Sequence, residues 1–319
     1  MSFTSNIKKE LTQLTSRGCC LKAELSAIVR LNGILQIKPS PPTLVITTEN
    51  PATARHTFAL CKAVLDLTPR LVIGHRSQLK KNRFYTIYIE KKVFTSLRKL
   101  GIIEHDSQKY ISGIDPQLIA DRCCKQSYLR GAFIASGSIN HPNSTSYHLE
   151  ITSTYLKHGQ ALAELMEKFY LNPRLMERKK GVVVYIKEGD KIGDLLNIMG
   201  AHPSLFTFEN VRILKDMRNS VNRLINCETA NLNKTIQAAQ TQIKNITLIK
   251  ERVGLEVLPP ALLEVAEARL ENPELNLGEL GQLLPNGPKS KSTINHRFRK
   301  ISEIAKGLQN KSYIESINR

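Results

Sequence analysis

The sequence predicts an α+β protein in which a duplicated αββαββα domain is followed by an all-α domain. Two observations carry this prediction. An internal repeat, offset by the 104 residues from Cys19 to Cys123, organises the first two thirds of the chain. After Pro259-Pro260 the pattern changes to helices alone. The length of 319 residues allows two domains, and a hydrophobic content of 41% is enough for packed cores.

The repeat is visible in residues that recur at a constant spacing. Cys19-Cys20 returns as Cys123-Cys124, and Gly33 returns as Gly137. The same offset relates Leu25 to Leu129 and Pro69-Arg70-Leu71 to Pro173-Arg174-Leu175. Because the offset holds without a gap over some fifty residues, we predict a duplicated domain over 1–206, with repeat units at about 19–104 and 123–206.

Each unit shows the same order of elements. Proline breakers, β-branched runs and an Asn50 N-cap with Pro51 at the first helical position mark their limits. In the first unit we expect helices over 19–32, 52–65 and 91–100 and strands over 35–38, 44–48, 70–75 and 84–90. In the second we expect helices over 124–136, 156–170 and 190–199 and strands over 138–141, 147–153, 174–179 and 182–187. Two such units would pair about a pseudo-two-fold axis.

The helix that opens each unit carries a stripe of small residues. Ser127, Gly131 and Ala135 are spaced four residues apart, so they share one helix face. Their equivalents in the first unit are Ala23, Ala27 and Leu31. Small side chains let two helix backbones approach closely, and we expect each stripe to pack against the other.

These two helices resemble the paired LAGLIDADG helices of homing endonucleases. The matching segments are Leu25–Gly33 and Leu129–Gly137. In that superfamily one acid per helix, just before the final glycine, holds the divalent cations that activate water. Here those positions are Asn32 and Ser136, which are neutral. We therefore expect no catalytic residues, no bound metal and no nuclease activity; the alternative is a nuclease that recruits other acids, such as Glu49 or Glu150.

The charge balance points to a polyanionic partner. The net charge is +18 and the pI about 9.7, which favours nucleic acid first and an anionic membrane surface second. The alternative is a generically basic protein. Between Arg70 and Lys99 there are nine Lys/Arg and one acid. Arg76, Lys80, Lys81 and Arg83 would surround a hairpin, either contacting phosphates or forming a solvated basic loop.

The distribution of apolar residues predicts neither a membrane-spanning helix nor a signal peptide. No apolar run approaches the roughly 20 residues that span a bilayer. The first fourteen residues lack the apolar stretch of a signal peptide. We expect a cytoplasmic protein without a membrane partner and with reduced cysteines.

The C-terminal domain is expected over 254–319, after linker helices over 207–253. Its pattern predicts helices over 261–271, 277–284 and 290–308, the last with an apolar stripe at Ile294, Phe298, Ile301, Ala305 and Leu308 and with Ser290 as its cap. Residues 254–288 hold six Glu and one Arg, whereas 289–319 hold eight Lys/Arg and two Glu. A polarised third helix is typical of a helix-turn-helix, although the preceding turn is long. A three-helix interaction domain is the alternative.

The third helix offers the residue types that a recognition helix needs for double-stranded DNA. Lysine and arginine neutralise phosphates, and short polar side chains at the N-terminal end read base edges. We expect phosphate contacts from Lys289, Lys291, Arg297, Arg299 and Lys300, and base contacts from Ser292, Thr293, Asn295 and His296.

The paired cysteines admit a zinc site or simple burial. Adjacent residues on a helix point about 100° apart, so four thiols from two helices are not expected to converge. We therefore expect buried, reduced cysteines that pack as small hydrophobes, and no cofactor.

Taken together, the chain resembles the WhiA family over essentially its whole length. The segments Asp216–Lys234 and Ser290–Lys300 are similar to that family's linker and last domain. The resemblance implies a transcription regulator of Gram-positive bacteria, associated with the nucleoid and tied to sporulation or to cell division and chromosome segregation. A second possibility is a scaffold that binds a protein or RNA through residues 1–206.

Overall fold

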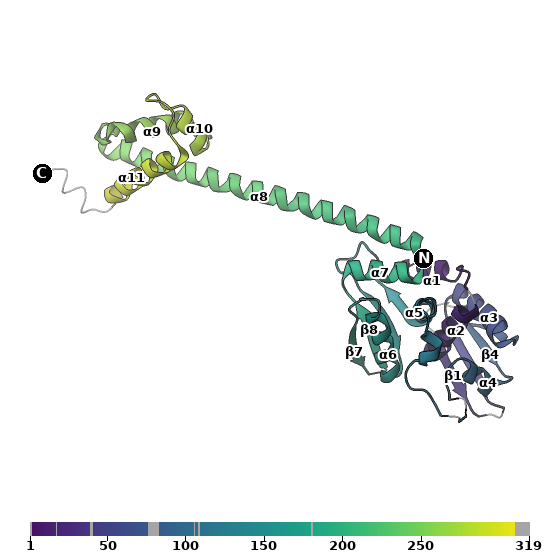
Figure 1. Cartoon of the computed structure of the whole chain (residues 1–319). Coiled ribbons are helices and arrows are strands. Elements are labelled where there is room, and N and C mark those ends of the chain that lie inside the picture. Colours follow the sequence, from purple (N-terminus) through teal and green to yellow (C-terminus); the bar gives the residue numbers. More distant parts are fainter. Residues whose placement is uncertain are drawn as a thin grey trace. The chain divides into compact units, whose positions relative to one another are not determined.

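The computed structural model describes residues 2–16, 18–38, 41–75, 83–104, 106–107, 109–179 and 181–309. The chain divides into two compact units, Met1–Asp216 and Met217–Arg319 (Figure 1). The first unit contains helices and two four-stranded antiparallel sheets, and the second is helical throughout its described part. The predicted α+β class, with a duplicated body and an all-α C-terminal domain, is confirmed.

The first half of the body follows the predicted αββαββα order. Its sheet has the strand order β1-β2-β4-β3, and Leu44 pairs with Ile89 in its centre. The carboxamide oxygen of Asn50 accepts hydrogen bonds from the backbone N–H groups of Ala52 and Thr53, so the expected N-cap is present. The elements are α2 (Gly18–Asn32), β1 (Gly33–Gln36), β2 (Thr43–Thr48), α3 (Pro51–Leu65), β3 (Arg70–His75), β4 (Arg83–Ile89) and α4 (Val93–Lys99).

The second half repeats this topology, with the strand order β5-β6-β8-β7. Leu149 pairs with Ile186 at the position that Leu44 and Ile89 occupy in the first sheet. The elements are α5 (Arg122–Ser136), β5 (Gly137–Ile139), β6 (Leu149–Ser153), α6 (Leu156–Glu167), β7 (Arg174–Arg178), β8 (Gly181–Ile186) and α7 (Gly189–Met199).

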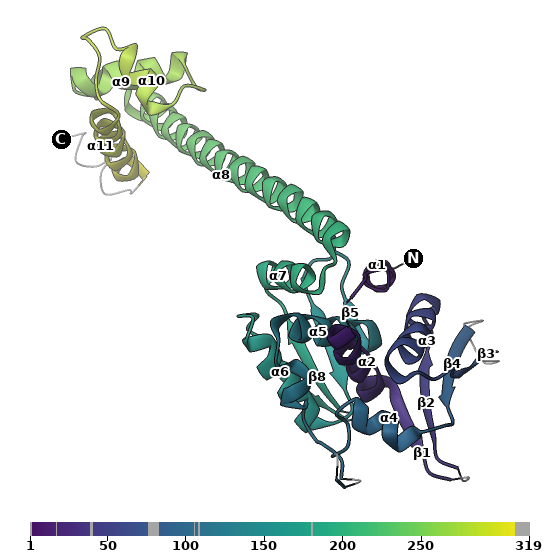
Figure 2. The ribbon, with the colours of Figure 1, turned by 45° about the vertical axis from the view of Figure 1, so that its right-hand side comes forward.

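Helices α2 and α5 lie side by side at the centre of the body (Figure 2). A Cβ atom added to Gly131 would lie 2.4 Å from the backbone oxygen of Glu24, so the two backbones meet where the small-residue stripes predicted it. Ala23, Ala27 and Ser127 are buried in the same contact. Only glycine allows this approach at 131, because any larger residue would collide with the backbone of α2.

The body also contains elements that the sequence pattern did not indicate to us. Helix α1 (Phe3–Leu11) buries Phe3, Ile7 and Leu11, which are spaced four residues apart, and Ser2 caps it. A short 3₁₀ helix (Pro116–Ile119) precedes α5. The four-residue spacing of these apolar residues is typical of a helix with one buried face, although the residues between them are polar.

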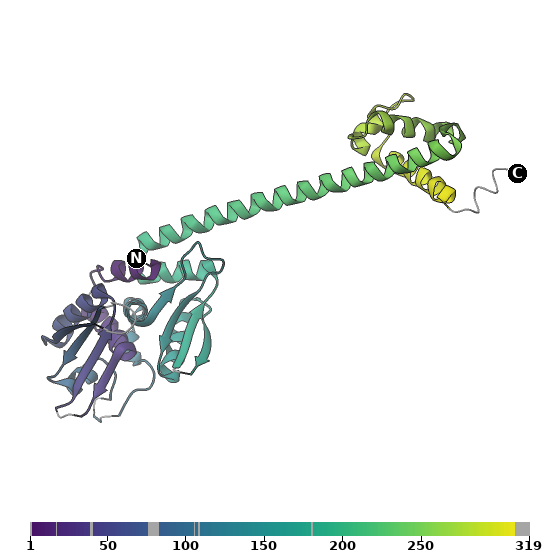
Figure 3. The same cartoon turned by 180° about the vertical axis from the view of Figure 1, so that it is seen from behind.

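The linker is one continuous helix, α8 (His202–Val253), rather than several linker helices. After a 3₁₀ turn (Leu255–Val257), α9 (Pro260–Glu271), α10 (Leu277–Gln282) and α11 (Lys291–Gln309) complete the second unit (Figure 3). Its core includes Ile246 and Ile249 of α8, so this unit extends well before the expected start at residue 254. Across the described residues, no helix combines the length and apolar character of a membrane span.

Candidate nucleic-acid interface

Helix α11 is held in the second unit by the predicted apolar stripe. Ile294, Phe298, Ile301, Ala305 and Leu308 are all buried, as expected. They pack with Leu262 and Val265 of α9, Leu280 of α10 and the end of α8. Burial of this face leaves the opposite face of α11 to solvent, and that face carries the predicted DNA-binding residues.

The turn between α10 and α11 is closed by backbone contact. The N–H of Lys289 donates to the carbonyl oxygen of Gly281 over 2.9 Å. A Cβ atom on Gly281 would lie 2.3 Å from the carbonyl oxygen of Lys289, so glycine is needed where the turn folds back on α10. Although longer than the turn of the prototype, this connection is therefore anchored at both of its ends.

Side-chain caps set the start of both helices around this turn. The Ser290 hydroxyl accepts from the N–H of Thr293 over 3.3 Å, which supports the expected cap of α11. The same hydroxyl also contacts the hydroxyls of Ser292 and Thr293. At α10, Asn276 and Glu279 form a capping box.

A buried arginine, which sequence reasoning missed, fixes the connection between α9 and α10. Arg269 is 1% exposed and donates to the carbonyl oxygens of Asn272, Pro273 and Leu275, the last over 2.6 Å. Its guanidinium lies 5.5 Å from the ring centre of Phe298 on α11. In the sequence, Arg269 stands out as the single Arg among six Glu in 254–288, which could have indicated a structural role for it.

Arg297 is the predicted phosphate contact whose placement differs most from expectation. It donates to a carboxylate oxygen of Glu264 on α9 over 3.1 Å, and both side chains are largely buried. The other carboxylate oxygen of Glu264 accepts from the N–H of Asn286 in the turn. Arg297 thus ties α11 to α9, and Glu264 ties α9 to the turn.

The remaining predicted residues share the solvent side of α11. Lys289, in the preceding turn, is half-buried. The exposed members are Lys291, Ser292, Thr293, Asn295, His296, Arg299 and Lys300. Within the described part of the chain, Arg299 and Lys300 form no ion pair, so their charges face solvent. This face combines cations with short polar side chains at the N-terminal end of one helix.

Helix α8 adds residues beside this face that sequence reasoning did not place there. A shallow groove of about 400 Å³ runs between α8 and α11. From α11 it is lined by Asn295, Phe298, Arg299 and Ser302. From α8 it is lined by one cation, Lys234, and by Gln237, Ala238, Thr241, Gln242 and Asn245.

At the other functional position, the C-terminal ends of α2 and α5 meet without carboxylates. The side-chain amide of Asn32 donates to the backbone oxygen of Ala135 over 3.2 Å, which joins the two helix ends. The Ser136 hydroxyl oxygen is buried and finds no hydrogen-bond partner among the described residues. The two positions that the LAGLIDADG resemblance assigns to metal-binding acids are therefore neutral, with Asn32 lining the adjacent pocket and the Ser136 hydroxyl buried.

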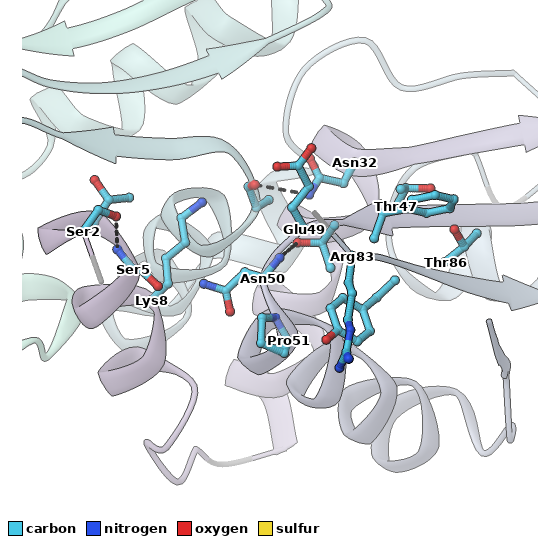
Figure 4. A pocket seen from close by; sticks show the side chains of 15 residues that line it. Ser2, Ser5, Lys8, Asn32, Thr47, Glu49, Asn50, Pro51, Arg83 and Thr86 are labelled. Carbon is cyan, nitrogen blue, oxygen red and sulfur yellow. Dashed lines mark hydrogen bonds between the residues drawn. The ribbon is translucent and has the colours of Figure 1, made fainter. Parts of the chain in front are cut away.

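A pocket of about 1150 Å³ opens beside Asn32, lined by α1, β2, the start of α3 and β4. Figure 4 shows Lys8 and Arg83 on opposite sides of Glu49 and Asn50 in that view. Burial lowers the pKa of Lys8 to about 8. Glu49 contributes a carboxylate to this pocket, whereas Glu150 pairs with Arg178 and His148 on the second sheet. The two acids weighed as substitute ligands therefore lie in different settings.

The basic strand region is described only in part. Arg76, Lys80 and Lys81 lie outside the described residues. Arg83 is exposed at the start of β4 and lines the pocket. Arg70 is paired with Glu90 and lies 4.3 Å from the ring centre of Tyr88.

The positions of four cysteines contradict the expectation that their thiols would not converge. The sulfur atoms of Cys19, Cys20, Cys123 and Cys124 all lie within 4.8 Å of one another. The argument from the 100° step between adjacent residues was wrong, because α2 and α5 begin side by side and each pair straddles their line of contact. Cys20 and Cys124 are buried, as expected, whereas Cys19 and Cys123 are exposed.

The fold and these positions define a class: a LAGLIDADG-like body with neutral helix ends, joined to a helix-turn-helix unit. Residues 18–103 match the WhiA N-terminal LAGLIDADG-like domain, residues 125–218 the WhiA LAGLIDADG-like domain, and residues 221–305 the WhiA C-terminal HTH domain. A relative from Brevibacillus brevis, named probable cell division protein WhiA, is 49% identical over 314 residues, 98% of this chain and 99% of its own. The chain belongs to the WhiA family.

Solved structures agree with this assignment. Full-length DUF199/WhiA from Thermotoga maritima matches with a TM-score of 0.60 and 27% identity, over 96% of this chain and 98% of its own. A structure of the N-terminal LAGLIDADG domain of DUF199/WhiA matches with a TM-score of 0.51 and 23% identity, over 62% of this chain and 90% of its own. The second likeness concerns the fold of the body.

Proposed function

We propose that this protein is a transcription regulator that binds specific double-stranded DNA sequences through α11 and acts in sporulation or in cell division and chromosome segregation. The observation that carries the proposal is the exposed face of α11, where cations and short polar side chains lie opposite a fully buried apolar stripe. A helix of this kind fits the major groove. The name of the Brevibacillus brevis relative, probable cell division protein WhiA, supports a role in cell division.

In the proposed complex the residues divide by task. Lys289, Lys291, Arg299 and Lys300 neutralise backbone phosphates and set the register. Ser292, Thr293, Asn295 and His296 read base edges near the N-terminal end of the helix. We assign Arg297 a positioning role instead of a phosphate contact, because its guanidinium is held by Glu264. Its charge still adds to the positive potential around the helix.

The proposal is tested with the full-length protein. Chromatin mapping identifies the bound sites, and fluorescence anisotropy then measures affinity for a duplex with the enriched sequence. Arg299→Ala/Lys300→Ala should weaken binding at least about tenfold and make the plot of log affinity against log salt shallower by about 1.8, since each phosphate contact contributes about 0.9. The matched control is Lys157→Ala/Lys168→Ala, which removes the same charge from exposed positions of the body. Equal losses from both variants would reject α11 as the interface.

We also propose that the body does not cut DNA. The support is the neutral pair Asn32 and Ser136 at the helix ends where homing endonucleases hold their metal ions. Supercoiled plasmid incubated with the pure protein and magnesium or manganese should stay intact. Nicking that disappears in Asn32→Ala, Ser136→Ala or Glu49→Gln would overturn this part of the proposal.

The sheets of the body favour a second candidate function, the binding of a protein partner. Ile34, Ile73, Leu175 and Met176 are between 41% and 62% exposed on β1, β3 and β7, which are edge strands of the two sheets. A partner captured by the full-length protein should be lost on Ile34→Ser/Ile73→Ser, while DNA affinity stays unchanged.

Fluorescent fusions should follow the nucleoid in the normal protein and spread in the Arg299→Ala/Lys300→Ala variant.

A further inference from the structure

Four thiols converge at the N-terminal ends of the central helices. Cys19 and Cys20 lie in the first turn of α2, and Cys123 and Cys124 lie in the first turn of α5. The sulfur atoms of Cys19 and Cys20 are 4.0 Å apart, and all four sulfurs lie within 4.8 Å of one another. These residues come from segments more than a hundred positions apart, so their meeting is a product of the fold rather than of local sequence.

The spacing of the sulfurs fits one tetrahedral ion. A zinc–sulfur bond of about 2.3 Å places the four sulfurs of a tetrahedral site about 3.8 Å apart. The present spacing therefore reaches that geometry with movements of less than about 1 Å, within the range of cysteine rotamers. An iron–sulfur cluster distributes its cysteines over several irons and needs a wider opening.

The electrostatic setting favours thiolates beside a cation. Both pairs lie at helix N-termini, where the helix dipole stabilises negative charge.

We propose that Cys19, Cys20, Cys123 and Cys124 form a structural tetrathiolate site for one zinc ion. Each thiol releases its proton to solvent when its sulfur becomes a ligand, and the ion keeps its oxidation state. The ion bridges α2 and α5 and so fastens the two halves of the body together at the ends remote from Asn32 and Ser136. Four protein ligands leave no open position for a substrate, which makes the site structural rather than catalytic.

The chemistry of four thiols favours zinc over two alternatives, a magnesium or calcium ion and a disulfide. Magnesium and calcium prefer oxygen ligands, so they do not compete for four sulfurs. A disulfide needs the sulfurs at about 2.05 Å and an oxidant, whereas the present separations are those of non-bonded atoms. The exposure of Cys19 and Cys123 gives chelators and oxidants access to a bound ion.

The first test measures metal content in the full-length protein, purified with a thiol reductant from cells grown with zinc. Elemental analysis should find about one zinc ion per chain. Cys227→Ser, which changes an exposed cysteine of α8 outside the cluster, is the matched control and should retain the metal. Cys19→Ser/Cys123→Ser should lose it. Zinc absent from the normal protein, iron in its place, or equal zinc in both variants would overturn the proposal.

A second measurement needs no variant and so is independent of whether the double mutant folds. Protein stripped of metal under reducing conditions and titrated with cobalt should develop the intense visible bands of tetrahedral cobalt bound to thiolates, and zinc should abolish them. A strong zinc chelator should lower the Tm of the body by about 5 °C or more. Weak octahedral cobalt bands, together with a Tm that ignores the chelator, would rule out a tetrathiolate site.

Discussion

The central helices of the body and helix α11 of the C-terminal unit use most of their charged residues in opposite ways. In the body, Glu24 is 1% exposed and contacts His56 over 2.7 Å and Arg130 over 3.5 Å. Arg30 is also buried and donates to the backbone oxygens of Gly101 and Ile111. On α11, by contrast, the cations face solvent, apart from Arg297, and the buried Arg269 belongs to α9.

If α11 binds DNA as proposed, this difference separates the residues that set the stability of the body from those that set DNA affinity. Buried charges hold the elements of the body together, since each must keep its partners to offset the cost of leaving water. Exposed charges add little to stability and are available to a polyanion. The comparison fails if substitutions in the body alter DNA affinity, or if they leave the stability of the body unchanged.

The largest effect is expected at Glu24. Glu24→Leu removes the carboxylate between His56 and Arg130 and leaves Arg130, which is largely buried, without its counter-ion. The free energy of unfolding of the body should fall by about 3 to 5 kcal/mol. Urea denaturation followed by circular dichroism measures this loss. DNA affinity of the folded fraction should not change, and a parallel loss of affinity would show that the two functions are coupled.

The second largest effect is expected from Gly131→Ala. The Cβ atom of the new residue would lie 2.4 Å from a backbone atom of α2. We expect a loss of about 3 kcal/mol in the free energy of unfolding. Gly113→Ala is the matched control, since a Cβ atom there would meet only the Cβ of Ala161 at 3.6 Å. Similar thermal denaturation curves for the two variants would contradict the close packing of α2 and α5.

A smaller effect is expected from pH at His158. This histidine is 0% exposed and is joined by hydrogen bonds to Tyr128 and Ser153. Burial lowers its pKa to about 3, against about 6.5 in an unfolded chain. The unfolded chain thus takes up the proton first as the pH falls. The contribution of His158 is therefore full above about pH 6.5 and declines toward pH 3, by about 2 kcal/mol between pH 7 and pH 5.

Denaturant titrations at several pH values measure this decline. His158→Asn cannot take up a proton, so the variant should be less stable at pH 7 but should lose less stability on acidification. An unchanged slope in the variant would show that other groups carry the acid sensitivity of the body.

The smallest effect is expected at Glu264 in the C-terminal unit. Glu264→Gln weakens the links to Arg297 and to the turn before α11. The free energy of unfolding of this unit should fall by about 1 kcal/mol, and DNA affinity should fall a few-fold because α11 is less well held. Differential scanning calorimetry and anisotropy measure the two effects. An increase in affinity would mean that the freed Arg297 contacts phosphate after all.

Most of the fold could be read from local sequence signals. The Asn50 cap and the stripe from Ile294 to Leu308 depend on residues near one another in the chain, and the 104-residue repeat appears when the sequence is compared with itself. The structure confirms each of them. Family resemblance then supplied the paired helices that place Asn32 and Ser136. Local signals suffice here because periodicity and caps are set within a few turns.

The features that were missed depend on tertiary placement. Nothing in the sequence around Arg297 shows that Glu264, 33 positions earlier, will hold its guanidinium. The convergence of four cysteines depends on how α2 and α5 cross, which a helical wheel for one helix does not contain. The sequence analysis expected several linker helices over 207–253, whereas the structure has the single helix α8.

The buried ion pairs of the central helices also record how far the two copies of the duplicated unit have diverged. At the 104-residue offset, Glu24 corresponds to Tyr128, Arg130 to Ser26, and Arg30 to Ile134. Two copies of the first half alone would bring together glutamates that lack the arginine they need, and two copies of the second would leave arginines without a carboxylate. The ion pair between Glu24 and Arg130 therefore needs one residue from each half, which a symmetric pair of identical halves would not supply.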